Sequence, residues 1–114
     1  MSHVVETLRG FGPVQAKAMF GGWGLYHEGV FFALVAGDVL YLKTDAENRA
    51  DFEARGLGPF VYPLKDGKGI TMTYFEAPED ALEDPAVMAR WARGAYAAAL
   101  RASARKAKAA KAPK

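Results

Sequence analysis

Three apolar runs follow one another between Met19 and Lys43, and short turn signals separate them. Glu28-Gly29 stands between the first two runs, and Ala36-Gly37-Asp38 between the second and the third. β-Branched and aromatic residues favour strands, and glycine beside an acidic residue favours tight hairpin turns. The pattern therefore predicts an antiparallel meander of three strands, Met19–His27, Val30–Ala36 and Val39–Lys43. The middle run is apolar on both faces, which is typical of a central strand covered on both sides.

Helical signals stand on either side of this meander. A short helix is expected from Ser2 to Gly10, where glycine ends it. Thr44-Asp-Ala-Glu47 has the spacing of a capping box, in which the Thr44 hydroxyl accepts from the Glu47 amide. The helix that it opens is expected to end at Arg55, with Gly56 as a left-handed stop. Two ion pairs of i,i+4 spacing are expected on that helix, Asp45–Arg49 and Asp51–Arg55.

The second half of the chain repeats the pattern of a hairpin followed by a helix. Pro59–Leu64 and Ile70–Phe75 are the expected strands, with Asp66-Gly-Lys-Gly69 between them. Asp84-Pro85 is a strong helix start, because an N-cap carboxylate precedes proline at the first helical position. The apolar face of that helix comprises Met88, Trp91, Ala92, Ala95, Tyr96 and Ala99. The element order is α-βββ-α-ββ-α, which predicts an α+β fold.

Charge adds a division that hydrophobicity alone does not show. The 114 residues carry a net charge of +2, but the charges are segregated. Residues 1–84 hold seven Lys/Arg and all thirteen Asp/Glu, a balance of −6, whereas residues 85–114 hold eight Lys/Arg and no acid. The chain is thus an acidic body with a basic C-terminal arm. We expect one domain over residues 1–101 and a flexible, low-complexity Ala/Lys tail over residues 102–114.

The composition also bears on where the protein works. The N-terminus has charges at Glu6 and Arg9 and no apolar run before a cleavage site, so no signal peptide is expected. The longest apolar stretch, Val30–Ala36, is far shorter than the ~20 residues that span a bilayer. Cysteine is absent, which agrees with a reducing compartment. We expect a soluble cytoplasmic protein that does not enter a membrane.

The sequence contains few side chains that are suited to catalysis or to metal binding. Ser2 and Ser103 are the two serines, one near each end, and the two histidines, His3 and His27, lie on different predicted elements. A nucleophile and its base must lie within hydrogen-bond reach, which terminal serines rarely achieve. Without cysteine or paired histidines, only carboxylates remain as metal ligands. No catalytic residue, metal site or cofactor is therefore expected. An unrecognised enzyme using Tyr26, Tyr41 or Glu28 is the least favoured alternative.

The glycine-rich segment around Trp23 is the first candidate binding surface. It resembles a phosphate loop only weakly, because a strand and not a helix follows the glycines. The glycines there favour a β-bulge or a close backbone approach. An apolar pair beside glycines near a sheet edge offers backbone groups and anchoring side chains to a protein partner. The candidate partner-binding residues are Met19, Phe20, Gly21, Gly22 and Trp23. The alternative is that Met19, Phe20 and Trp23 are core residues, and the exposure of Trp23 separates the two.

The basic arm is the second candidate surface, and nucleic acid is its expected partner. Lysine and arginine bind phosphate backbones through counterion release, although the arm lacks aromatic residues that would stack on bases. The alternative is a solvated helix end. The candidate nucleic-acid-binding residues are Arg101, Arg105, Lys106, Lys108 and Lys111.

Several sequence blocks resemble the N-terminal domain of the TfoX/Sxy competence regulators. The most specific block is Ala18-Met-Phe-Gly-Gly-Trp-Gly-Leu-Tyr26, and the resemblance extends from about Val4 to Leu100. The later blocks follow in order: Gly29–Val35, Leu40–Lys43, Phe52–Ala54, Pro59–Tyr62, Met72–Phe75, Pro78, Leu82–Asp84 and Trp91–Arg93.

The resemblance implies an antiparallel sheet flanked by helices, similar to that of secretion chaperones. It also implies a non-enzymatic bacterial regulator of transcription that binds a protein partner, acting with a cyclic-AMP-dependent activator at its promoters. A homodimer is a further expectation. The full-length regulators carry a second, C-terminal domain, whereas here the basic tail follows Leu100. The resemblance therefore carries the fold to this chain more directly than the competence role.

Overall fold

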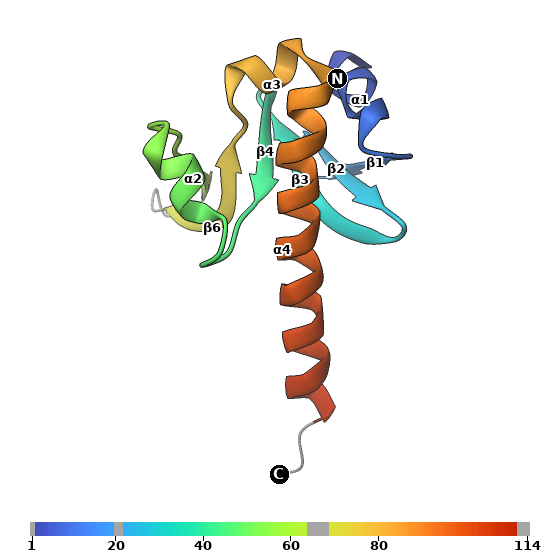
Figure 1. The fold of residues 1–114 in the computed structure, drawn as a ribbon. Coiled ribbons are helices and arrows are strands. Elements are labelled where there is room, and N and C mark those ends of the chain that lie inside the picture. Colours follow the sequence, from blue (N-terminus) through green and yellow to red (C-terminus); the bar gives the residue numbers. More distant parts are fainter. Residues whose placement is uncertain (1, 20–21, 64–68, 112–114) are drawn as a thin grey trace.

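The computed structural model describes residues 2–19, 22–63 and 69–111 (Figure 1). Side chains are described for 3–18, 22–61 and 73–104. The six strands of the described chain form one antiparallel sheet in the order β1-β2-β3-β4-β6-β5. They are β1 Gln15–Met19, β2 Gly22–His27, β3 Val30–Ala36, β4 Val39–Lys43, β5 Pro59–Pro63 and β6 Gly69–Glu76.

The helices are α1 Ser2–Thr7, α2 Arg49–Ala54, α3 Glu79–Glu83 and α4 Pro85–Lys111, with a 3-10 turn, η1, over Leu8–Gly10. The α+β class and the antiparallel sheet flanked by helices are thereby confirmed. None of the helices in the described residues is long and apolar enough to cross a membrane.

The two predicted turns of the meander are confirmed by their backbone angles. Glu28 and Gly29 have φ of 49° and 80°, and Gly37 and Asp38 have φ of 56° and 63°. Two successive residues with positive φ twist in the same sense as the flanking strands, which is why such turns join hairpins. The turn expected around Asp66 lies outside the described residues.

The prediction of a single strand over Met19–His27 was wrong. The chain has a hairpin there, in which β1 pairs antiparallel with β2 and Met19 lies opposite Gly22. Gln15–Met19 alternates polar and small residues, so its strand signal was too weak to recognise. The meander therefore has four strands.

Gly22 makes the close backbone approach that was one of the two expectations for these glycines. A Cβ atom at this position would collide with the carbonyl oxygen of Val35 on β3. The register shift between β2 and β3 lies further along, between Leu25 and Tyr26.

Helix α4 begins where the sequence predicted. The Asp84 side chain accepts a hydrogen bond from the Ala86 amide at 2.9 Å, and the Asp84 carbonyl accepts from the Met88 amide at 2.9 Å. The first satisfies an amide that has no partner within the helix. The helix then continues to Lys111, beyond the end of its apolar stripe.

The core lies between α4 and one face of the sheet. Alanines at the contact, including Ala92 and Ala95, are fully buried and let the helix lie close to β3 and β4 (Figure 1). Opposite them lie Leu25, Phe32 and Leu42, which are also fully buried. Burying each large apolar side chain contributes about 1.5–3 kcal/mol.

Aromatic side chains on the other face of the sheet pack in a row. Phe31 lies between Tyr26 and Tyr74, with ring-centroid distances of 5.1 and 5.3 Å. Lys17 lies over the Tyr26 ring and Lys43 over the Tyr74 ring, at 4.8 and 5.1 Å. Burial, and secondarily the nearby Tyr26, raises the pKa of Tyr74 to about 12. Neighbouring rings and lysines thus occupy this row, which is not an open stacking platform for bases.

Candidate functional site

The predicted partner-binding segment is partly described. Phe20, Gly21 and the side chain of Met19 lie outside the described residues. Trp23 is 40% exposed, although it pairs with Ala18 on β1 and Val35 on β3 in the middle of the ladder. Core residues are buried, whereas an exposed tryptophan ring is available to a binding partner. The core alternative is therefore wrong for Trp23, while partner binding by the segment stays a prediction.

Arg101, the first residue of the predicted nucleic-acid-binding arm, forms an ion pair within the fold. The Arg101 guanidinium donates to both carboxylate oxygens of Asp45, at 2.6 and 2.9 Å, and lies 3.0 Å from a Glu47 carboxylate oxygen. These bonds lower the pKa of Asp45 to about 2. The side chains of Arg105, Lys106, Lys108 and Lys111 lie outside the described residues, although the backbone there is helical.

The capping box predicted at Thr44 was wrong, and a hydrogen-bonded turn over residues 45–48 precedes α2 instead. The Thr44 hydroxyl donates to the Thr73 carbonyl at 3.1 Å, and its amide donates to the same oxygen, so Thr44 continues the pairing of β4 with β6. Asp45 instead accepts from the Glu47 amide at 2.9 Å, while Asn48 accepts from the Asp45 amide at 2.7 Å. Sheet pairing outcompeted the local cap, and α2 begins only at Arg49.

The two predicted ion pairs on α2 were also wrong. Arg49 pairs with Glu53 at 3.9 Å, and Asp45 is held by Arg101 from α4. The Arg55 guanidinium binds both carboxylate oxygens of Asp80, at 3.2 and 3.3 Å. For Asp45 and Arg55, tertiary partners thus displaced the predicted local ones, because exposed i,i+4 pairs contribute only ~0.3–0.5 kcal/mol. The left-handed stop at Gly56 is confirmed, with φ of 72°.

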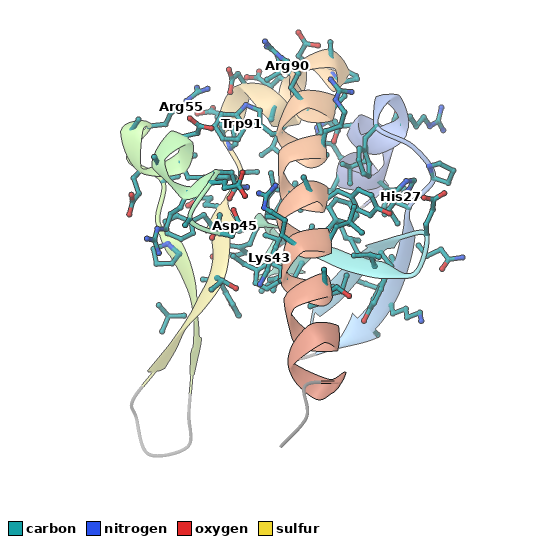
Figure 2. All side chains as sticks on the ribbon, turned by 60° about the horizontal axis from the view of Figure 1, so that its bottom comes forward. His27, Lys43, Asp45, Arg55, Arg90 and Trp91 are labelled. Carbon is teal, nitrogen blue, oxygen red and sulfur yellow. The ribbon has the colours of Figure 1, made fainter. Side chains whose placement is uncertain are left out.

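A groove that no sequence pattern predicted runs between α2 and α4. Its volume is about 470 Å³. The Trp91 ring meets the Phe52 ring edge-on at 4.8 Å, and the Arg55 guanidinium lies 5.8 Å from the Trp91 centroid. Figure 2 shows Arg55, Trp91 and Arg90 at the same end of the molecule. The full lining is Asn48, Asp51, Phe52, Ala54, Arg55, Arg90, Trp91 and Gly94.

The two histidines have structural partners. His27 Nδ1 lies 2.6 Å from the Pro13 carbonyl, and the His27 ring packs against Phe11 and Tyr96 at 4.7 and 4.9 Å. His3 Nε2 lies 2.7 Å from the carbonyl of Leu82. Among the described residues, no group of three His, Asp or Glu side chains is placed to hold a metal ion.

The residues of the enzyme alternative lie in separate surroundings. Tyr26 packs on Phe31, and the Tyr41 ring lies 5.0 Å from that of Phe60. Glu28 lies in the exposed turn after β2, and none of Tyr26, Tyr41 and Glu28 lines the groove.

Comparisons with known proteins agree with the fold and the order of its motifs. The sequence model of the TfoX N-terminal domain matches residues 6–99. DNA transformation protein TfoX1 of Aliivibrio fischeri (strain ATCC 700601 / ES114) is 34% identical over 90 residues. The match covers 75% of this chain and 43% of that protein, so the chain corresponds to less than half of its relative. The chain belongs to the TfoX N-terminal domain family.

Proposed function

We propose that this domain is a non-enzymatic regulatory module that binds a protein partner through the β1–β2 hairpin. Membership in a family whose relative is a DNA transformation protein supports a regulatory role. The observation that carries the proposal is the exposure of Trp23. Buried aromatic anchors supply most of the binding energy in many interfaces, and tryptophan is the residue most enriched among them.

The position of Trp23 supports a protein partner further. β1 is the terminal strand of the sheet, and no described strand pairs with its outer edge. An unpaired edge offers amides and carbonyls to an added strand. The hairpin therefore presents backbone groups on β1 and an aromatic anchor on β2 side by side.

The partner that we propose is a cyclic-AMP-dependent transcription activator. The family resemblance supports this choice. A second copy of the chain, pairing edge to edge through β1, is the competing occupant of the same surface, and the two are separated by experiment.

Titration calorimetry of the purified chain with the purified activator tests the proposal. Trp23→Ala should weaken binding at least tenfold, because truncating a central anchor costs about 2 kcal/mol or more. Val61→Ala is the matched control, since Val61 is 49% exposed on β5, at the opposite edge of the sheet. Equal affinity of Trp23→Ala and wild type would contradict the proposal. A dimer in analytical ultracentrifugation that Trp23→Ala dissociates would assign the surface to self-association.

Association with nucleic acid through the basic arm is the second candidate. The observation in its favour is that α4 stays helical to Lys111 and carries no acid after Asp84. Binding to arbitrary duplex DNA should then fall steeply with salt, and a chain ending at Ala102 should lose it. Equal affinity of the two chains would remove this candidate.

A further inference from the structure

The groove between α2 and α4 has an aromatic floor that is only partly covered. Phe52 is buried in the core beneath it, with 1% of its surface exposed. Trp91 packs on Phe52 and is half-buried, so part of its ring borders the hollow. An apolar side chain from a ligand would therefore contact Trp91 without any rearrangement of the core.

Gly94 lines the groove at a position where packing would allow a larger residue. Glycine in the interior of a helix costs stability relative to alanine. Gly94 lies in the middle of α4, and a Cβ atom added there would meet no other group within 4 Å. Packing therefore does not require glycine at this position. Its effect is to leave space beside Trp91, where a side chain would narrow the groove.

The two walls of the groove carry opposite charges. On α4, Arg90 is exposed and has no ion pair or hydrogen bond among the described residues, whereas Arg55 is already neutralised by Asp80. On α2, Asp51 is exposed, and its carboxylate likewise has no ion pair or hydrogen bond among the described residues. A ligand carboxylate is thus attracted to the α4 wall and repelled from the α2 wall, which fixes its orientation.

Two hydrogen-bonded contacts hold the walls of the groove in place, one at its rim and one beyond it. The Asn48 side-chain Nδ2 donates to the Gly94 carbonyl at 3.4 Å, so the loop before α2 is tied to α4. Further along α4, Arg101 forms the charge-assisted pair with Asp45 that is described above. A groove whose walls are fixed in advance loses less entropy when a ligand binds.

We propose that this groove binds a peptide segment of a partner protein, with an apolar side chain against Trp91 and a neighbouring carboxylate on Arg90. The charges of the groove support an acidic peptide as its ligand. The carboxylate of such a peptide would lie against Arg90 on α4, a helix that contains no Asp or Glu. This site lies apart from the Trp23 surface and does not depend on it.

An array of acetylated hexapeptides tests the proposal. Each peptide carries one Leu or Phe and one Glu, at every spacing, on an alanine background, and each has a Gln counterpart. The array is probed with the labelled full chain, and the strongest peptides are titrated against Trp23→Phe, in which Trp91 is the sole tryptophan and its fluorescence reports on the groove. Glu-bearing peptides should bind at least tenfold more tightly than their Gln counterparts.

Matched variants assign the binding to the groove. Arg90→Gln should lose at least tenfold in affinity, while Arg93→Gln, which removes the same charge from an exposed position outside the groove, should keep it. Gly94→Leu should block binding, with Gly94→Ala as the milder variant if leucine impairs folding. Trp23→Ala should bind the peptides as wild type does, so loss of the hairpin interaction and loss of the groove interaction are separable. Equal binding of Glu and Gln peptides, or equal losses at Arg90 and Arg93, would overturn the proposal.

Discussion

Helix α4 meets the segment around α2 at two places, and the two contacts are built differently. Just past the middle of the helix, Arg101 is held by Asp45 and Glu47 at distances between 2.6 and 3.0 Å. Nearer its N-terminal end, Gly94 and Trp91 face the groove. The first contact, called the closed contact below, is an ion pair that fills the space between the two segments. The second, called the open contact, is a groove whose floor is formed by Phe52 and Trp91.

The difference shows which part of this contact stabilises the fold. The Asp45–Arg101 pair fixes the chain before α2, and Phe52 seals the core beneath the helix. The hollow above Phe52 adds no packing, and its glycine lowers stability. Closed and open contacts on the same pair of elements therefore predict opposite responses to substitution.

The largest effect is expected where the groove meets the core. Phe52→Ala should lower the free energy of unfolding by about 3–4 kcal/mol, because it removes a buried ring and leaves a cavity. Phe52 contacts Phe75 as well as Trp91, so both the sheet and α4 lose a partner. Urea unfolding followed by circular dichroism measures the change. A loss below 1 kcal/mol would contradict the assignment of Phe52 to the core beneath the groove.

The closed contact should respond next most strongly. Arg101→Ala should lower the free energy of unfolding by about 2 kcal/mol, since hydrogen bonds to charged groups contribute ~1.5–3 kcal/mol and partial exposure reduces this. Arg93→Ala on the same helix is the control and should change stability by less than about 0.5 kcal/mol. Urea unfolding of both variants makes the comparison. Equal values for the two arginines would remove the distinction between a closed contact and a solvated charge.

Low pH should remove the contribution of the Asp45–Arg101 pair to the free energy of unfolding. The pKa of Asp45 is about 2 in the fold against its ordinary value of 3.8, so the unfolded chain binds the proton more tightly. The contribution is therefore complete above about pH 4 and disappears as the pH falls toward 2. The difference of about 1–2 kcal/mol between wild type and Arg101→Gln should shrink over that range. Thermal unfolding at each pH follows it, and a constant difference down to pH 2 would contradict the assignment to Asp45.

Sequence patterns predicted the elements whose signals are local. The turns at Glu28-Gly29 and Gly37-Asp38, the start of α4 at Asp84 and its alanine-rich face all follow from residues close in sequence. β1 was missed because Gln15–Met19 has neither β-branched nor aromatic residues. Thr44 was misassigned because Thr73, 29 residues away, captured its hydroxyl.

The candidate sites divide in the same way. The exposure of Trp23 could not be predicted, since a tryptophan in an apolar block is equally consistent with a core position. The groove needs residues from α2 and α4 at once, and no local pattern predicts such a contact. Arg101 was predicted to contact nucleic acid, and its partner Asp45 was expected to pair with Arg49. Contacts between distant elements decided each of these outcomes.

The measurement that tests the contrast between the two contacts most directly is the stability of Gly94→Ala. If the groove is open, the added methyl group meets nothing and the helix gains, so the free energy of unfolding should rise by about 0.5–1 kcal/mol. Urea unfolding beside wild type gives the value from one pair of curves. A loss of 1 kcal/mol or more would show that Gly94 is closely packed, and the open groove with its proposed ligand would then be wrong.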